Sequence, residues 1–181
     1  TALQAAEARQ LDTTTTYDAD GLPTDTYGPA HAVDTPTGGH TQARAHVHNT
    51  YDEGAPGGAT FGLVTTSTES ARPTDRSAEF DARTTSNLYA LGSDTSGWTL
   101  GTPLQTIVDP GSSPHLNLKT TTLYDTTTGL LTERRLPAGP SGGDAHATLS
   151  IYYTSGTNPS DSRCSSHPEW AGLPCIQQPA A

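Results

Sequence analysis

Short runs of strand-forming residues that end in a tyrosine recur along this chain, and each is followed by a polar turn. The clearest are Thr13–Tyr17 and Thr120–Tyr124. Threonine is β-branched and favours extended backbone, and the arm from Leu130 to Leu136 alternates in character as a half-buried strand does. Two such arms joined by a short turn predict a β-hairpin. We therefore predict an all-β fold of repeated antiparallel hairpins over residues 13–153.

The tyrosines that end these runs are regularly spaced, which indicates an internal repeat. Tyr17, Tyr51, Tyr89 and Tyr124 follow one another at intervals of 34, 38 and 35 residues. We predict one hairpin unit near each tyrosine. The arms that return after the four turns are Gly21–Thr26, Gly62–Ser67, Gly97–Leu100 and Gly129–Arg134.

Aspartate follows three of the four tyrosines, at Asp18, Asp52 and Asp125, whereas Ala90 follows the other. An aspartate side chain can bond backbone two residues further on and so opens a turn. Glycine, at Gly21 and Gly129, supplies the positive φ that ends the turn. The tyrosine ring is expected to fill the layer between hairpins. All of these repeated residues are thus predicted to be structural.

Composition limits how large a core the chain can build. Only 31% of its 181 residues are hydrophobic, and its net charge is −10. Charged residues make up just 15%, and threonine is in excess, so strands are favoured over disorder. Because so little apolar surface can offset the backbone entropy, we expect a piece of a larger structure. A Thr/Pro/Gly-rich disordered linker is the competing interpretation.

The same composition bears on partners and on the ends of the chain. The nine basic residues are scattered, which argues against nucleic acid, and no apolar run is long enough for a transmembrane helix. Residues 1–12 are predicted to be a connector with a short helix over Ala2–Gln10. Residues 154–181 are predicted to be a loop closed by cysteines, followed by a tail.

The order of threonine-rich arm, Tyr-Asp, turn, glycine and second arm resembles the Rhs/YD-repeat family. The best copies are Thr13–Tyr27 and Thr120–Leu136, and the segment Ile151–Cys175 is similar to one found in secreted Rhs proteins. The single Asp109-Pro110 lacks the partner motif of the self-cleaving members. That activity is therefore not expected here.

The resemblance implies a spiralling β-sheet shell in a secreted or cell-surface protein, where it encloses or presents a toxin or effector domain. The partners would be the rest of the same polypeptide, meaning neighbouring repeats and a C-terminal effector. No catalytic residue, metal ligand or cofactor is expected of such a scaffold. We predict a structural protein that is not an enzyme.

Cys164 and Cys175 are the only cysteines, and in an extracellular protein they predict a disulfide that closes the loop between them. Trp170 would be the apolar plug of that loop. Two other interpretations remain open: zinc ligation by both cysteines with His167, for which a fourth ligand is not apparent, and free thiols.

Other candidate sites are weaker. His46 and His48 lie on one face of a predicted strand, with His40 near, but the local pattern supplies no third ligand. Asp18, Asp20 and Gly21 resemble only the start of a calcium loop. The Gly-x-Ser-x-Gly match at Gly139–Gly143 lies in a Gly/Pro loop without a following helix, so we assign it no role.

Aromatic residues suggest the alternative function, an extracellular carbohydrate-binding or cell-surface-binding β module. The direction in which the tyrosines point separates the two functions, because packed rings favour a scaffold and a solvent-facing row favours sugar binding. The residues concerned are Tyr17, Tyr27, Tyr51, Tyr89, Tyr124, Tyr152, Tyr153, Trp98 and Trp170.

Overall fold

The computed structural model describes residues 11–75, 78–137 and 146–180. Those residues form eleven strands, one short α-helix and three 3-10 turns, and the strand pairs with a defined register are antiparallel. The all-β, hairpin-rich prediction is therefore confirmed. The helix predicted at Ala2–Gln10 and the Gly139–Gly143 match lie outside the described residues.

The strands range in length from four residues in β1 to twelve in β4. They are β1 (Thr14–Tyr17), β2 (Pro23–Tyr27), β3 (His31–Asp34), β4 (His40–Tyr51), β5 (Val64–Pro73), β6 (Phe80–Leu88), β7 (Gln105–Val108), β8 (Leu118–Tyr124), β9 (Leu131–Arg135), β10 (Ala147–Tyr152) and β11 (Pro174–Pro179). The helical segments are α1 (Ser96–Leu100), η1 (Pro56–Gly58), η2 (Ser162–Cys164) and η3 (Pro168–Trp170). Among the described residues, no helix has the length and apolar character needed to cross a membrane.

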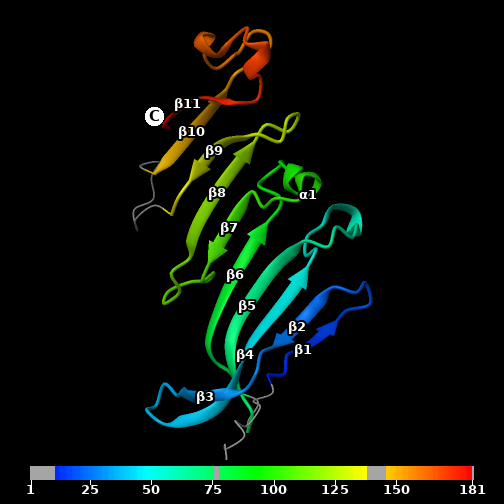
Figure 1. Ribbon diagram of the computed structural model, residues 1–181, viewed down its shortest axis with the longest axis vertical. Coiled ribbons are helices and arrows are strands. Elements are labelled where there is room, and N and C mark those ends of the chain that lie inside the picture. Colours follow the sequence, from blue (N-terminus) through cyan, green and yellow to red (C-terminus); the bar gives the residue numbers. More distant parts are fainter. Residues whose placement is uncertain (1–10, 76–77, 138–145, 181) are drawn as a thin grey trace, which may run out of the picture. The chain divides into compact units, whose positions relative to one another are not determined.

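The chain divides into two compact units. The first contains the described residues up to Tyr51 together with Thr66–Thr84. In it, hydrogen-bonded neighbours follow the order β1-β2-β4-β5-β6, and β3 pairs with β4 (Figure 1). The long strand β4 lies between β2 and β5, so side chains on one of its faces can meet side chains of both neighbours.

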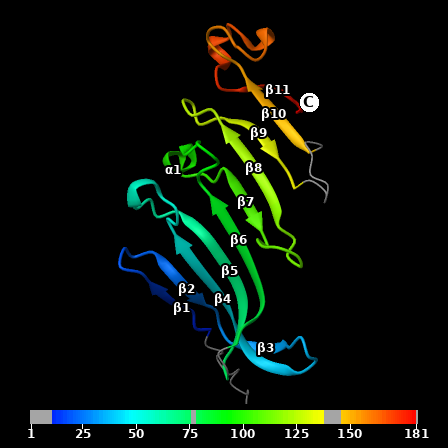
Figure 2. The ribbon, with the colours of Figure 1, turned by 180° about the vertical axis from the view of Figure 1, so that it is seen from behind.

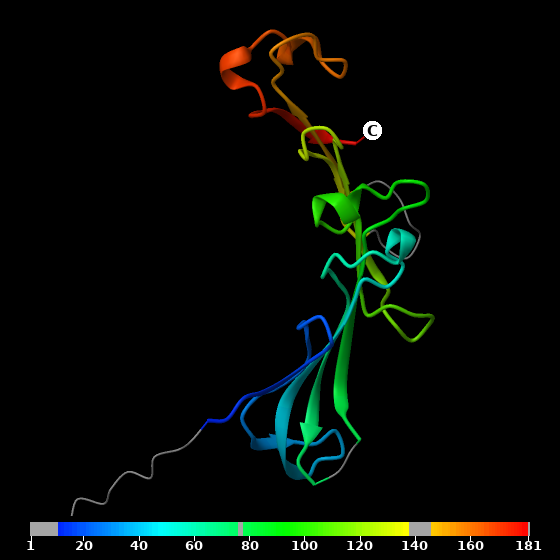
Figure 3. The same cartoon turned by 90° about the vertical axis from the view of Figure 1, so that its right-hand side faces the viewer.

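The second unit contains Asp52–Thr65 and the described residues from Thr85 onward. Its neighbours follow the order β6-β7-β8-β9-β10-β11 (Figure 2). Seen from the side, these strands stand in one thin layer, and the segment between β10 and β11 loops away from their ends (Figure 3). The segment predicted as loop and tail thus contains a strand, β11, which begins and ends with proline.

Aspartate closes three of the turns between paired strands. The Asp18 carboxylate accepts the N–H groups of Asp20 and Leu22, and the Asp125 carboxylate accepts those of Thr127 and Thr128. Asp52 has a longer reach, because its carboxylate accepts the N–H groups of three consecutive residues, Phe61 to Leu63. Gly21 and Gly129 follow with positive φ, 81° and 71°.

The unit predicted near Tyr89 is built differently. Gly97–Leu100 is not the returning arm of a hairpin, because these residues lie in α1, and the returning strand is β7. Trp98 is 4% exposed and packs against Tyr89 and Phe61, with ring centroids 4.8 Å and 5.3 Å away. Burying this large ring at the turn accounts for the helix where the pattern predicted a strand.

The hydrophobic core is small. Of the described residues, only Ala43, Tyr89, Trp98, Leu104, Ala147 and Cys164 are buried hydrophobic residues, and Leu104 and Cys164 have the largest fully buried side chains. The fold therefore relies on strand pairing, turn bonds and a cross-link to a greater extent than a two-layer domain does.

Candidate functional site

Tyrosine hydroxyls join successive hairpins in a repeated way. Tyr51 Oη donates to the carbonyl of Pro23 at 2.8 Å, and Tyr89 Oη donates to that of Val64 at 3.1 Å. Tyr152 Oη donates to the carbonyl of Leu131 at 2.8 Å. Each acceptor is the first residue of a strand, namely β2, β5 and β9. We call these three contacts the tyrosine locks.

Asparagine accompanies two of the locks. The amide of Asn87 donates to Val64 at 3.1 Å, and that of Asn49 donates to Pro23 at 3.5 Å. In both cases the asparagine precedes the tyrosine by two residues, so the two side chains share one face of the strand.

Tyr152 lies outside the repeat predicted from sequence, because Tyr153 stands where the repeat has aspartate and the interval from Tyr124 is shorter than the others. The signal that reveals it is structural. The pairing register shifts at Tyr17, Tyr124 and Tyr152 alike, so each of these tyrosines follows a β-bulge or a similar irregularity.

The remaining repeat tyrosines behave differently from one another. Tyr17 is 63% exposed on the outer strand β1, whereas Tyr124 is half-buried in β8. Burial raises the pKa of Tyr124, and it raises the pKa of Tyr89 too. The repeat tyrosines thus do not form a solvent-facing row among the described residues.

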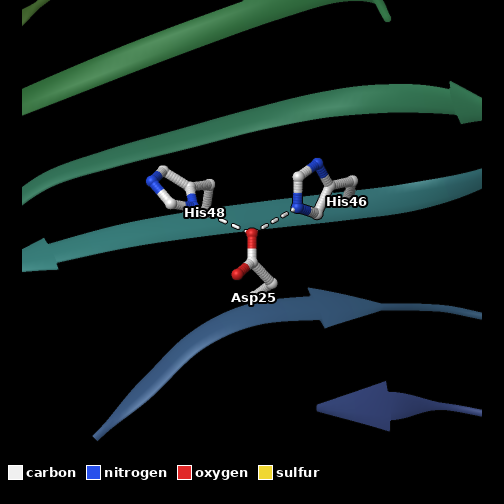
Figure 4. Close-up of side chains that lie close together, drawn as sticks. All are labelled: Asp25, His46 and His48. Atoms are coloured by element: carbon white, nitrogen blue, oxygen red, sulfur yellow. Dashed lines mark hydrogen bonds and ion pairs between the residues drawn. The ribbon is translucent and has the colours of Figure 1, made fainter. Parts of the chain in front are cut away.

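A group of side chains that can titrate or ligate a metal ion lies on one face of β2 and β4. Asp25 of β2 is the register partner of His48 in β4, and Tyr27 is the partner of His46. Residues opposite each other across an antiparallel pair share a face, as do residues two apart in one strand. The register therefore brings the Asp25 carboxylate between the two imidazoles (Figure 4).

One oxygen of Asp25 serves both histidines. Asp25 Oδ1 lies 3.0 Å from His46 Nε2 and 2.8 Å from His48 Nδ1. The other oxygen, Oδ2, accepts from Thr16 Oγ1 at 3.1 Å. The hydrogen bond with His48 lowers the pKa of Asp25 most strongly, and bonds with His46, Thr16 and Thr24 lower it further against the opposing effect of burial. We call Asp25, His46 and His48 the β2–β4 cluster.

The second nitrogen of His46 faces another carboxylate. His46 Nδ1 lies 2.9 Å from Glu79 Oε1, and Glu79 also accepts from Ser70 at 2.6 Å and from Arg72 at 2.8 Å. Burial raises the pKa of Glu79, but the bonds from these three neighbours lower it below its usual value. Glu79 is therefore held as a carboxylate against the ring.

His46 itself is the fixed member of the β2–β4 cluster. It is 6% exposed, and its ring stacks on Tyr27 with centroids 4.3 Å apart and planes 7° from parallel. His48 is nearly half exposed, with 48% of its side-chain surface accessible. The cluster thus combines one buried, oriented imidazole with one that solvent can reach.

Sequence reasoning identified His46 and His48 but missed Asp25 and Glu79. Asp25 is remote in sequence and meets the histidines only through the β2–β4 register, which no local pattern specifies. His40 does not join them, because it lies against the exposed Asp34 at the other end of β4. The Asp18 carboxylate is occupied by its own turn, which leaves the calcium interpretation without support.

The predicted disulfide between Cys164 and Cys175 is present, with Cα atoms 5.9 Å apart. Both thiols are used in it, so the zinc and free-thiol interpretations are wrong. Trp170 is not an enclosed plug, because it is 44% exposed. It stacks on His167 and meets the edge of Tyr153, with ring centroids 4.8 Å and 5.1 Å away.

Comparison with known proteins adds no assignment to these sites: no family model matches the chain, and no curated protein sequence matches it.

Proposed function

We propose that this chain is a structural, non-catalytic β-sheet segment of a secreted or cell-surface protein of the Rhs/YD-repeat type. Its role is to form part of a wall that encloses or presents a toxin or effector domain of the same polypeptide. The tyrosine locks are the observation that carries this proposal, because the hydroxyls of two repeat tyrosines, Tyr51 and Tyr89, and that of Tyr152 each fasten one hairpin to the next.

The use of those hydroxyls distinguishes a wall from a binding surface. A ligand-binding tyrosine keeps its hydroxyl or ring face available, whereas Tyr51, Tyr89 and Tyr152 direct theirs to backbone carbonyls within the sheet. The Cys164–Cys175 disulfide fits the proposed location, since such bonds persist in oxidising compartments.

A second candidate function rests on a different place in the chain. Tyr153, His167 and Trp170 form an aromatic group in the disulfide-closed segment, and Trp170 is 44% exposed. Exposed aromatic rings are suited to stacking on sugars, so this group is where a carbohydrate-binding module would have its site.

The scaffold role predicts that removing a lock hydroxyl costs stability. Tyr89→Phe should lower the free energy of unfolding by about 1 kcal/mol, because the Val64 carbonyl loses a hydrogen bond donor. Tyr152→Phe should behave alike. Urea unfolding followed by far-UV circular dichroism measures both.

Tyr17→Phe is the matched control, since Tyr17 lies exposed on an outer strand and is expected to tolerate the change. The proposal is rejected if Tyr89→Phe and Tyr152→Phe are as stable as the Tyr17 variant. A glycan-array screen separates the second function: binding that Trp170→Ala abolishes and Tyr89→Phe retains would establish a carbohydrate module in place of a wall.

A further inference from the structure

We propose that the β2–β4 cluster binds a divalent first-row transition metal ion, best matched by Zn²⁺, through Asp25 Oδ1, His46 Nε2 and His48 Nδ1. The ion would tie β2 to β4 within the first unit. This inference does not depend on the scaffold role, because it rests on the geometry of these three side chains and of the residues that hold them.

The three ligand atoms lie close enough together to share one metal ion. All three lie within 4.8 Å of one another, and the two distances to Asp25 Oδ1 are 2.8 Å and 3.0 Å. Ligand atoms around a tetrahedral Zn²⁺ ion are about 3.3 Å apart. Small side-chain rotations would therefore admit an ion among the three atoms without any change in strand pairing.

The surroundings of His46 call for a cation beside its ring. Both ring nitrogens face carboxylate oxygens, Glu79 at 2.9 Å and Asp25 at 3.0 Å. A neutral imidazole has one N–H, so one of these contacts would set a lone pair against a carboxylate. When Nδ1–H donates to Glu79, a cation between Nε2 and Asp25 removes that conflict. The candidates are a proton and a metal ion.

The neighbours of the cluster favour the metal ion. A histidine that ligates a metal usually donates its other N–H to a carboxylate, which fixes its tautomer and orientation. Glu79 occupies that position and is itself held by Ser70 and Arg72. Asp25 is oriented in the same manner by Thr16, and Tyr27 stacks on the His46 ring. The ligands are thus held in place before an ion arrives.

The donor set selects the kind of ion. Two imidazole nitrogens and one carboxylate oxygen suit Zn²⁺ and its first-row neighbours, whereas Ca²⁺ and Mg²⁺ prefer oxygen ligands alone. His48 is 48% exposed at its side chain, so ions and water can reach the cluster from solvent. Water would complete the coordination, which leaves one or more positions exchangeable.

Titration of the chelator-treated full chain with ZnCl₂ in a calorimeter tests the proposal. We expect saturable binding of one ion per chain and a rise in thermal midpoint when Zn²⁺ is present. His48→Ala should abolish that binding, and because His48 is partly exposed, the variant should keep its fold. Glu79→Gln should weaken binding by about 10–100-fold, as loss of a carboxylate behind a ligand histidine does.

His115→Ala is the matched control, because His115 also pairs with an aspartate, Asp109 at 2.7 Å, but lies in the second unit, where the described residues supply no third ligand. Its Zn²⁺ affinity should equal that of the unmodified chain. Absence of one-to-one binding, or equal affinity in the His48 variant while circular dichroism shows both folded, overturns the proposal.

Discussion

At the scale of single residues, Gly97 shows how closely the backbone of this protein packs. A Cβ atom at this position would lie 2.6 Å from the carbonyl oxygen of Tyr89 and 2.8 Å from that of Thr102. Both neighbours are backbone atoms and cannot rotate away. Only glycine allows α1 to sit against the end of β6, where Trp98 is buried.

Gly97→Ala should therefore destabilise the protein by about 1–3 kcal/mol through overpacking. A loss of stability would be informative, because alanine in place of glycine within a helix usually stabilises a protein by up to about 1 kcal/mol. Urea unfolding followed by tryptophan fluorescence measures the change. Gly156→Ala is the control, because nothing lies within 4 Å of its added Cβ, and a loss equal to that of Gly97→Ala would refute the packing argument.

Residue chemistry that acts over a short stretch of chain could be predicted from sequence. Asp18 and Asp125 bond the backbone two residues on, as turn chemistry requires, and Cys164 and Cys175 could be paired because the chain has no other cysteine. Asp25 could not be predicted as a partner of His46 and His48. Their meeting depends on which residues of β2 and β4 lie opposite each other, and that register is a property of the sheet.

At the scale of elements, the Asp52 turn connects β4 to β5 through one carboxylate. Its oxygens accept three consecutive backbone N–H groups at 2.8–3.0 Å. Burial opposes ionisation, but these three bonds prevail and lower the pKa of Asp52 below its ordinary value of 3.8. The ionised form is thus the form that holds the turn.

The sign of the pH dependence follows from that lowered pKa. The stabilisation is fully present above about pH 3.8 and is lost as pH falls through the pKa of the folded state. Asp52→Asn should be less stable by about 1 kcal/mol at pH 7, and the difference should shrink at pH 3. Urea midpoints of both proteins across this range measure it, and a constant difference would contradict the assignment.

Elements were predictable where one residue type dominates and were missed where packing decides. Threonine-rich arms ending in Tyr17 and Tyr124 are strands β1 and β8. Gly97–Leu100 forms a helix because Trp98 is buried beside Tyr89 at a turn. The pattern of hydrophobic and polar residues carries no information about that contact. β11 lies in the segment predicted as loop and tail, because Pro174 and Pro179 weaken its strand signal.

At the scale of the whole molecule, the described residues form many strands but bury few hydrophobic side chains. Leu104 is buried completely, yet Leu116 and Leu173 are 68% and 55% exposed. Folded proteins are stable by only about 5–15 kcal/mol, and so small a core places this chain toward the low end. A single covalent constraint is then a large fraction of its stability.

We accordingly expect the Cys164→Ser, Cys175→Ser double variant to lose about 3 kcal/mol, chiefly because the unfolded chain is no longer constrained. A reductant should lower the thermal midpoint of the unmodified chain in the same direction. Far-UV circular dichroism through a thermal ramp measures both effects. Identical midpoints with and without the cross-link would show that the β10–β11 pairing alone maintains this end of the second unit.

The prolines of β11 also bear on solubility. An outer strand normally presents a row of amide donors and acceptors that another chain can extend into an intermolecular sheet. Pro174 and Pro179 remove the amide proton at two of the six positions in β11. A β11 edge that lacks those two amide protons pairs poorly with a strand of another chain. This edge therefore resists the fibril growth to which open, threonine-rich sheets are prone.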